Sequence, residues 1–460
     1  MKRSLATAAL LTAWVVTAAA GLVPAQATPA PASSSGDAFY TPPAGYESAA
    51  PGTILKSRET QASLFSLVPQ RAQAWQLLYR TTDQLGNPEA TVSTVLLPAG
   101  ATPDPKRPLV SYQYATDSAD PDCAPSRTIT AGNPITTIAG QAEILLVNAL
   151  LVKGYAVSIP DYEGPNAAFG ATRQAGQAVL DGIRAAEGFT PLGLGGKQTP
   201  VGMFGYSGGA VATNGAAEAQ PAYAPELTIR GSAAGGSLGN DFPGVITNFN
   251  GGPFASLAAS AIAGLSEAYP AITDVLLQYA NDKGKKAIES LKHMCVTEAA
   301  LNFLFANIDT FTTVPLAQLL ALPEVKQVIA DDSPGQHTPA APMYLYHGVF
   351  DEVLPIKGVD SMVQNFCANG ATITYNRDLL AEHGIALLTG VGGALSWLDD
   401  RLDGQAPNPG CHTSTVLSDI FQPGTAEAFG SRLIYANFLS LLGLPVGPAG
   451  LYGPPANATS

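Results

Sequence analysis

Short apolar runs alternate with longer amphipathic stretches along most of this chain. Short apolar runs are typical of strands buried on both faces, whereas longer periodic stretches are typical of helices. Strands are therefore predicted at residues 74–80, 90–97, 108–114, 156–160, 201–204, 227–233, 343–346 and 372–375. Helices are predicted between several of these strands, for example at residues 138–153 and 173–187. The alternation predicts an α/β fold, with a mostly parallel central sheet and helices on both of its faces.

One long interval departs from this alternation. Residues 240–340 carry helical segments only, which are predicted at 252–267, 271–281, 285–294, 297–308 and 314–330. We interpret the interval as a helical cap, because it is rich in apolar residues and is inserted between two strands of the sheet. The alternative is that these helices pack within the core like the others. With the cap at 240–340, the core consists of residues 39–239 and 341–460.

The first 27 residues have the features of a secretory signal peptide. Lys2 and Arg3 precede an apolar stretch over residues 5–22 and an A-x-A cleavage motif at 25–27. Residues 28–38 are rich in proline, alanine and serine, and we expect a flexible leader there. A membrane anchor is the alternative, but no second uncharged apolar run of about 18 residues follows. The chain is therefore expected to be secreted.

Charge and cysteine content fit an extracellular protein. The formal net charge is −13, and the loss of Lys2 and Arg3 with the signal makes it more negative. An acidic surface without basic runs argues against nucleic acid or anionic membranes as partners. Four cysteines in an exported chain predict two disulfides, for which three connectivities are available. A metal site is not expected, because the cysteines and histidines lack the spacing of a tetrahedral ion site.

A serine flanked by glycines stands where a predicted strand meets a helix-like run. Residues 205–209 read Gly-Tyr-Ser-Gly-Gly, after the strand at 201–204 and before small, helix-compatible residues at 209–219. This order is the local form of a nucleophile elbow, whose sharp turn strains the backbone of the serine and exposes its hydroxyl. The pattern favours Ser207 as a nucleophile.

A second match to the same motif centres on Ser237. A match to this motif is weak evidence by itself, because a chain with 47 glycines in 460 residues is expected to contain roughly 0.3 matches by chance. Ser237 also follows a predicted strand, but Pro243 and Gly244 argue against a helix directly after it. We therefore interpret Ser237 as a loop residue.

A serine nucleophile needs a base that takes its proton and an acid that orients the base. In α/β-hydrolases the three residues occur in the order serine, acid, histidine. Asp351 follows the predicted strand at 343–346, and His383 follows the next one at 372–375, just ahead of a helix. These two residues are therefore the predicted acid and base of Ser207.

Other acids and histidines compete for these roles. Glu352 and Asp378 are the alternatives to Asp351. His347 lies four residues before Asp351, and we expect it to orient the acid loop by hydrogen bonding rather than to act as the base. The remaining histidines lie in the predicted cap or beside a cysteine: His293, His337 and His412.

Acyl transfer at Ser207 also needs donors for an oxyanion. One donor is expected from the amide of Gly208, and a second from the loop at 115–120, near Asp117. That loop lacks the HGGG sequence of many esterases, and an ordinary surface loop is the alternative.

Cys367 and Cys411 lie on either side of His383. A bond between them would hold the histidine segment to the body of the protein and stabilise the fold by something on the order of 4 kcal/mol. Cys123 would then pair with Cys295 and tie the region after the third predicted strand to the cap. This connectivity is inferred from placement.

Several strings of residues, spread over nearly the whole mature chain, resemble the secretory lipases of the lipase A type found in yeasts and actinobacteria. They are residues 39–43 (FYTPP), 111–113 (SYQ), 117–118 (DS), 123–126 (CAPS), 160–164 (PDYEG), 180–185 (LDGIRA), 205–210 (GYSGGA), 223–227 (YAPEL), 250–254 (NGGPF) and 381–383 (AEH). The resemblance implies an α/β-hydrolase with a helical cap and, in the 341–460 part, a C-terminal flap over an acyl tunnel.

The resemblance also implies the roles of the site residues. Ser207 is the implied nucleophile, Asp351 the acid and His383 the base, while Asp117 and Gly208 form the oxyanion hole. The implied activity is hydrolysis of triacylglycerols and simpler fatty acid esters through an acyl-enzyme, without metal or cofactor.

The same resemblance supports pairing Cys123 with Cys295 and Cys367 with Cys411. A monomer that contacts a lipid interface transiently is expected. The alternatives are a short-chain esterase, a secreted aminopeptidase of the same fold, and a non-catalytic protein that keeps the fold.

Overall fold

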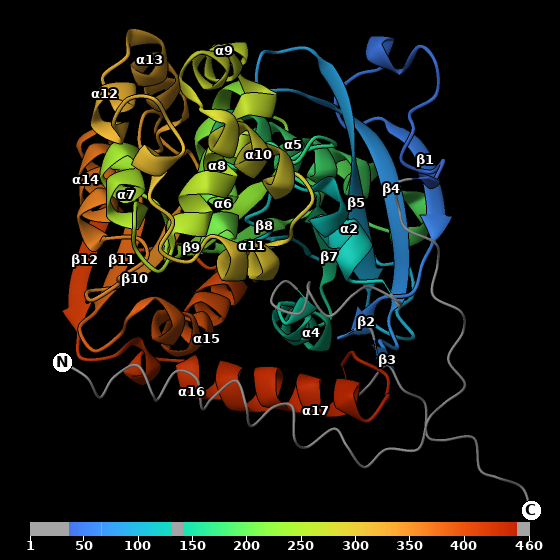
Figure 1. Ribbon diagram of the computed structural model, residues 1–460. Coiled ribbons are helices and arrows are strands. Elements are labelled where there is room, and N and C mark those ends of the chain that lie inside the picture. Colours follow the sequence, from blue (N-terminus) through green and yellow to red (C-terminus); the bar gives the residue numbers. More distant parts are fainter. Residues whose placement is uncertain (1–35, 66, 131–140, 449–460) are drawn as a thin grey trace, which may run out of the picture. The chain divides into compact units, whose positions relative to one another are not determined.

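The computed structural model describes residues 36–65, 67–130 and 141–448 (Figure 1). The predicted signal peptide at 1–27 and most of the predicted leader at 28–38 lie outside the described residues. In the part that the structure describes, no helix has the length and apolar content that spanning a bilayer requires.

Ten strands form one sheet in the order β1-β4-β5-β7-β6-β8-β9-β10-β11-β12. The first four strands in this order, β1, β4, β5 and β7, pair antiparallel with their neighbours. All pairs from β7 onward, through β6 to β12, are parallel. The bounds are β1 Ile54–Glu59, β4 Gln73–Thr82, β5 Pro88–Leu97, β6 Leu109–Gln113, β7 Ala156–Pro160, β8 Val201–Tyr206, β9 Ile229–Gly235, β10 Met343–Gly348, β11 Ile373–Asp378 and β12 Cys411–Val416. The predicted, mostly parallel sheet is thereby confirmed.

The eight predicted strands are present as β4 to β11, and the two strands at the sheet edges are the ones that the sequence did not predict. All residues of β6, β7 and β8 are buried, which explains why their sequences are mostly apolar. In contrast, β12 is almost wholly exposed and β1 is partly exposed, so their polar sequences carry no apolar run. A short hairpin of β2 (Ser63–Leu64) and β3 (Val68–Pro69) lies outside this sheet.

Helices cover both faces of the sheet, as predicted. Successive residues of β8 point to opposite faces, so Met203 belongs to one apolar core and Phe204 to the other. The helices that contribute to the Met203 core are α5 Thr172–Gly188, α6 Gly208–Tyr223 and α14 Ile356–Ala368. Those that contribute to the Phe204 core are α4 Ile144–Lys153 and α15 His383–Leu402. The predicted helix at 138–153 thus begins at Ile144, and its first residues, 138–140, lie outside the described part.

The last described residues form short helices against α4 and α15. Figure 1 shows α17 running beside α4, and side chains join the two, since Asn437 donates to the backbone oxygen of Leu145 over 3.1 Å. The bounds are α16 Thr425–Glu427 and α17 Tyr435–Leu441, with one wider helical turn between them.

The interval predicted as a cap is helical, and it supplies most residues of two apolar clusters, which also include residues outside it such as Ala119, Ala168 and Val353. Its helices are α7 Phe242–Phe249, α8 Ala255–Ala268, α9 Pro270–Tyr279, α10 Asp282–Leu291, α11 Val296–Asn302, α12 Leu316–Leu320 and α13 Pro323–Asp332. No boundary separates them from the sheet, because residues 34–460 form one compact unit. The division into core and cap therefore remains a prediction.

Two details of the cap differ from the sequence-based expectation. The helix expected at 314–330 is interrupted, because Pro323 lies in the first turn of α13 and cannot continue α12. No helix follows Ser237 directly, as predicted, but the sequence did not predict α7, which begins at Phe242. Pro243 fits in the first turn, where its missing N–H has no partner to lose, and the Asp241 side chain caps the helix by accepting from Gly244 N over 3.1 Å.

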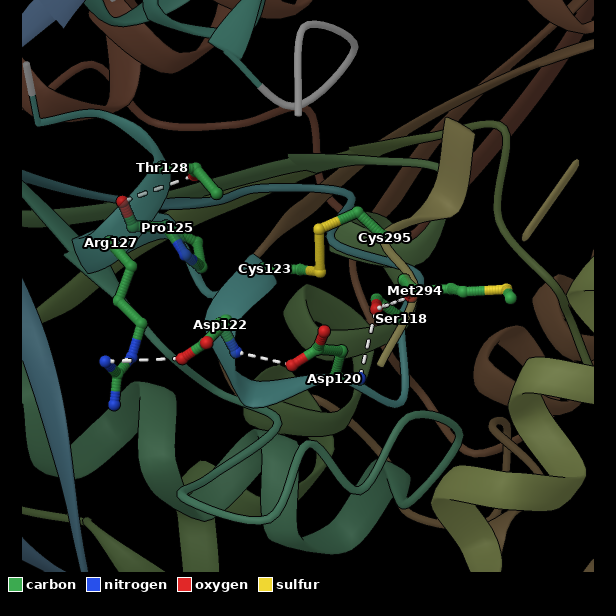
Figure 2. Close-up of a disulfide and its surroundings, with 9 residues drawn as sticks. All are labelled: Ser118, Asp120, Asp122, Cys123, Pro125, Arg127, Thr128, Met294 and Cys295. Carbon is green, nitrogen blue, oxygen red and sulfur yellow. Dashed lines mark hydrogen bonds and ion pairs between the residues drawn. A yellow bond between two sulfur atoms is a disulfide. The ribbon is translucent and has the colours of Figure 1, made fainter. Parts of the chain in front are cut away.

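All four cysteines form disulfides. Cys123 bonds to Cys295, which joins the loop after β6 to the start of α11 (Figure 2). Cys367 near the end of α14 bonds to Cys411, the first residue of β12. The pairing is the one inferred from placement, and the second bond anchors an exposed edge strand to the helix layer.

Candidate active site

Ser207 occupies the sharp turn between β8 and α6. Its backbone has φ 54° and ψ −121°, a conformation that side-chain-bearing residues rarely adopt. The turn is so tight that a Cβ atom at Gly205 would lie 2.2 Å from the backbone oxygen of Gly209. The motif therefore needs glycine at this position, and the strained elbow expected from the sequence is present.

The structure brings the three predicted triad residues into one hydrogen-bonded chain. His383 Nε2 lies 3.0 Å from Ser207 Oγ, and His383 Nδ1 lies 2.7 Å from Asp351 Oδ2. The second carboxylate oxygen, Asp351 Oδ1, accepts from Val353 N over 3.0 Å and from Leu354 N over 2.7 Å. These contacts leave Nδ1 as the donor to Asp351 and Nε2 free to accept the serine proton.

The parallel sheet explains why residues so far apart in sequence converge. Ser207, Asp351 and His383 each follow the carboxyl end of a strand, and those strands, β8, β10 and β11, run in the same direction. Loops at the carboxyl ends of parallel strands share one edge of the sheet. His383 is also the first residue of α15, so its backbone is fixed by the start of a helix.

The pKa values of Asp351 and His383 are shifted in opposite directions, and both shifts favour the charged forms of the pair. Burial raises the pKa of Asp351, but the hydrogen bond from His383, the two neighbouring histidines and the Leu354 amide bring it below its usual range. Burial lowers the pKa of His383, whereas the hydrogen bond and charge of Asp351, with the charges of Glu352 and Asp117, raise it above its usual value. The carboxylate thus remains ionised when the imidazole takes up a proton.

This shift sets an expected pH dependence. Only neutral His383 accepts a proton from Ser207, so kcat/KM is expected to fall as pH drops through a value above the ordinary histidine pKa of about 6.5. The variant Glu352→Gln removes one of the negative charges that face His383, and its acid limb should lie at lower pH than that of the wild type. A pH–rate profile of both proteins checks this, and an unchanged limb in the variant would contradict it.

Asp117 and Gly208 lie together beside Ser207. A Cβ atom at Gly208 would lie 1.8 Å from Asp117 Oδ1, so the carboxyl group packs directly on the glycine. Gly208 is the first residue of α6, and its amide therefore has no partner within the helix. Asp117 has φ 50°, and its Oδ1 atom is buried without a hydrogen-bond partner. The loop at 115–120 thus reaches the elbow and is not a remote surface loop.

The competing residues have other partners. His347 Nε2 lies 2.7 Å from the backbone oxygen of Leu354 and 3.3 Å from Asp351 Oδ2, so it orients the acid loop as expected. Burial lowers the pKa of His347, which keeps the ring neutral. Ser237 is a buried loop residue, and its hydroxyl accepts from Asn214 Nδ2 over 2.7 Å.

Of the alternative acids, neither replaces Asp351 beside the imidazole. Glu352 accepts from the backbone amide of His383 over 3.2 Å. The Asp378 carboxylate accepts from Leu380 N and from Ser418 and Asp419 in the next loop. The three remaining histidines contact other residues. His293 lies near Glu289, the backbone amide of His337 donates to Glu218, and His412 bonds to the backbone oxygen of Pro409.

Two further residues support His383 and were not identified from the sequence. Tyr206 donates its hydroxyl to the backbone oxygen of His383 over 2.5 Å, and the two rings lie 5.3 Å apart. Glu382 caps α15 by accepting from Gly384 N and Ile385 N. Tyr206 is inside the elbow motif, which signals its position but not its contact. Glutamate is not among the usual capping residues, so Glu382 gave no signal.

A largely apolar cavity with an empty volume of about 750 Å³ opens beside Ser207. Its walls come from α6, α7, α8 and the acid loop, and its few polar groups include Asp117, Glu163 and Thr172. A second apolar cavity of about 1040 Å³ lies among the cap helices, and Phe242 and Ile246 of α7 line both. Among the described residues, no group of three histidine, cysteine or acidic side chains is arranged to hold a metal ion.

Comparison with known proteins finds similarity over most of the chain. The family model described as secretory lipase matches residues 129–410. A lipase A from Arthroderma benhamiae is 40% identical over 433 residues, which cover 91% of this chain and 90% of the relative. A Mycobacterium tuberculosis protein named a probable inactive lipase is 39% identical over 402 residues, which cover 87% and 90%.

Solved structures agree with these matches. The closed state of Candida antarctica lipase A matches with a TM-score of 0.80 and 30% identity, over 90% of this chain and 98% of that one. A rice cell wall degrading esterase from Xanthomonas oryzae matches with a TM-score of 0.58 over 78% of this chain and all of that chain. At 18% identity, this second likeness concerns the fold alone.

Proposed function

The chain belongs to the secretory lipase family of carboxylic ester hydrolases, and we propose that it cleaves fatty acid esters through an acyl-enzyme formed on Ser207. The observation that carries the proposal is the unbroken hydrogen-bonded chain from Ser207 through His383 to Asp351. Such a chain is the arrangement that makes a serine hydroxyl nucleophilic.

The proposed reaction begins when His383 Nε2 takes the proton of Ser207 as Oγ attacks the ester carbonyl. The amides of Gly208 and Asp117 are the proposed donors to the oxyanion of the tetrahedral intermediate. Asp351 stabilises the imidazolium, which then protonates the departing alcohol. A water molecule repeats the sequence on the acyl-enzyme and releases the fatty acid.

Long acyl chains are the proposed substrates, because the cavity beside Ser207 is largely apolar and shares lining residues of α7 with a second apolar cavity. A secreted aminopeptidase would instead need a charged acidic group for the free amine. Asp117 and Glu163 do line the cavity, but burial raises the pKa of Asp117 to about 6 and that of Glu163 well above its usual range. Glu163 is therefore a poor partner for an ammonium, and the Asp117 carboxyl packs directly on Gly208 rather than facing open space.

The rate profile across acyl lengths tests this proposal. We expect kcat/KM for p-nitrophenyl esters to rise about two- to fourfold for each methylene added between acetate and octanoate, since each buried methylene contributes about 0.8 kcal/mol. Aminoacyl anilides, assayed side by side, should be hydrolysed far more slowly. A flat profile or a preference for acetate would make the protein a short-chain esterase, and faster anilide cleavage would make it a peptidase.

Contact with a lipid interface is proposed from exposed apolar side chains in the segments that follow β10, β11 and β12, at the sheet edge that also carries the triad. Phe350 precedes the triad acid, Leu380 precedes the triad base, and Phe421 follows β12, and all three are more than half exposed. Secretion is proposed from the signal-like residues 1–27, the two disulfides and the name of the family. A monomer is the proposed active form, because one chain supplies all three triad residues.

A non-catalytic role is the remaining alternative, since one relative is named a probable inactive lipase. The intact geometry of Ser207 and His383 in this chain favours catalysis instead. Labelling with a fluorophosphonate separates the two, because the reagent bonds covalently only to an activated serine. Stoichiometric labelling of Ser207 is expected of the proposed enzyme.

A further inference from the structure

The loop that follows β6 carries Asp117, the proposed oxyanion donor, in a strained conformation. Asp117 has φ 50°, which a residue with a side chain adopts only where its surroundings hold it. On the cap side the loop is held just past Asp117, because Ser118 Oγ donates to the backbone oxygen of Met294 over 2.9 Å and Cys123 is bonded to Cys295 (Figure 2). Other contacts hold the loop ahead of Asp117, where it leaves the sheet.

Glu143, the residue directly before α4, bonds to the start of this loop. Its Oε1 atom accepts from the backbone amide of Ala115 over 2.8 Å, two residues ahead of Asp117. Its Oε2 atom accepts from the hydroxyl of Tyr112, in β6, over 2.8 Å. One carboxyl group therefore joins the sheet, the start of the loop and the beginning of α4.

Tyr112 gives this carboxyl a fixed partner. Its side chain is buried, and its ring packs edge to face against Tyr114 and Phe204, with ring centroids 5.3 and 5.5 Å away. Tyr112 belongs to the SYQ string at 111–113, to which the mechanism assigns no role. Because the ring is packed on the sheet, its hydroxyl sets the place of the Glu143 carboxyl.

A second tyrosine bonds to the same peptide group from its other side. Tyr162 donates its hydroxyl to the backbone oxygen of Tyr114 over 2.5 Å, and that oxygen also accepts from Thr116 N over 3.0 Å. The carbonyl of Tyr114 and the amide of Ala115 belong to one planar peptide group. Glu143 and Tyr162 therefore hold the N–H and the C=O of a single peptide plane, and only Thr116 separates that plane from the Asp117 amide.

We propose that Glu143 is a positioning residue for the oxyanion hole, and that its carboxyl fixes the Tyr114–Ala115 peptide group from which the strained turn at Asp117 begins. The inference rests on the proposed function. Glu143 bonds to the amide of Ala115, so this contact leaves the Asp117 amide to the oxyanion. Glu143 does not line the cavity beside Ser207, and in this role it touches no reacting atom.

Glutamine is the conservative replacement at this position. Burial raises the pKa of the Glu143 carboxyl to about 8, although the hydrogen bonds from Tyr112 and Ala115 lower it. The carboxyl is therefore largely neutral at pH 7, and an uncharged amide of the same length imitates it. The amide oxygen of Glu143→Gln can accept from Ala115 N, and its NH₂ group can donate to the Tyr112 hydroxyl.

The test compares variants of Glu143 in the full-length enzyme at pH 7. Glu143→Leu removes both hydrogen bonds and should lower kcat for a p-nitrophenyl ester at least about tenfold, towards the 10²-fold loss typical of one missing oxyanion donor. KM should stay within about threefold of the wild type, since the acyl cavity is unchanged. Glu143→Gln should keep kcat within about threefold, a rescue that is not expected if the residue merely fills space.

Asn148→Leu is the matched control, because it removes a buried polar group from the same helix. Asn148 Nδ2 donates to Asn437 Oδ1 in α17 over 3.1 Å, and not to the loop after β6. Its kcat should stay within about twofold even if its melting temperature falls. A trifluoromethyl ketone inhibitor, which forms an oxyanion on Ser207, should bind Glu143→Leu more weakly by the same factor as the fall in kcat/KM.

The outcomes separate this inference from the proposed function, which fails if Ser207→Ala keeps its activity. With activity dependent on Ser207, unchanged kcat in Glu143→Leu overturns the inference, as does an equal loss in Asn148→Leu or unweakened binding of the inhibitor. If Glu143→Leu does not fold, Glu143→Asp decides, because its shorter carboxyl should lose kcat while Glu143→Gln keeps it. Equal kcat in these two variants would also overturn the inference.

Discussion

Replacement of Ser207 by alanine is expected to reduce kcat for ester hydrolysis by about 10⁶-fold, the scale seen when a triad nucleophile is removed. The hydroxyl is the atom that bonds to the acyl carbon, and His383 Nε2 lies 3.0 Å from it with no other nucleophile in reach of that nitrogen among the described hydrogen bonds. Alanine keeps the backbone of the elbow, so the protein should remain folded. Steady-state assays with a p-nitrophenyl ester, after removal of trace esterases, measure the loss.

Ser237→Ala is the control for that experiment, because Ser237 lies in the second serine motif. Its hydroxyl is buried and bonded to Asn214, so its loss should affect stability more than rate. We expect kcat within a few fold of the wild type. Activity that survives in Ser207→Ala and disappears in Ser237→Ala would refute the assignment of the nucleophile.

The sheet could be predicted from the sequence because its central strands are buried on both faces. The runs that became β6 to β8 are apolar at nearly every position, so they differ clearly from the helices around them. The edge strands β1 and β12 face solvent. An exposed polar segment has no alternation of apolar and polar residues that would distinguish a strand from a loop. Their place in the sheet follows only from pairing with β4 and β11.

Prolines were the main source of error in the cap. The segment that forms α7, with Pro243 in its first turn, was not predicted as a helix, and Pro323 was placed inside one. A proline favours the first turn of a helix and opposes its interior. The effect of a proline on a predicted helix is therefore known only when the N-terminal capping residue of that helix has been identified. Asp241 before α7 was the available signal, since an aspartate followed by a proline-containing first turn is a common start.

The proximity of Ser207, His383 and Asp351 could be predicted because chain order and strand ends fix where these residues lie. The residues that support it could not, because their contacts join segments with no local pattern. Tyr206 reaches His383 across 177 positions, and Tyr162 reaches Tyr114 across 48. Such contacts depend on the packing of the folded chain, which no short-range periodicity encodes.

The Asp351 carboxylate uses its two oxygens for different tasks. Oδ1 accepts from the amides of Val353 and Leu354, and Oδ2 accepts from His383 Nδ1 over 2.7 Å. An asparagine at this position has one oxygen and one NH₂ group. The two amides require the oxygen on their side, so the NH₂ group would face the imidazole.

Asp351→Asn is therefore expected to lower kcat by about 10⁴-fold with little change in fold. An NH₂ donor beside Nδ1 forces the proton of neutral His383 onto Nε2, which then faces Ser207 as a donor and cannot accept its proton. The variant also lacks the charge that stabilises the imidazolium. Steady-state kinetics measure the loss, and an NMR spectrum of the imidazole nitrogens reports the tautomer.

The matched control is Asp378→Asn, which changes the acid at the end of the neighbouring strand. Asp378 joins two loops by accepting from Leu380, Ser418 and Asp419, and it has no hydrogen bond to His383 among the described contacts. This variant should lower the melting temperature while kcat of the folded protein stays within several fold. Near-normal kcat in Asp351→Asn together with a large loss in Asp378→Asn would transfer the role of the acid to Asp378, and the convergence of β8, β10 and β11 would then need another catalytic explanation.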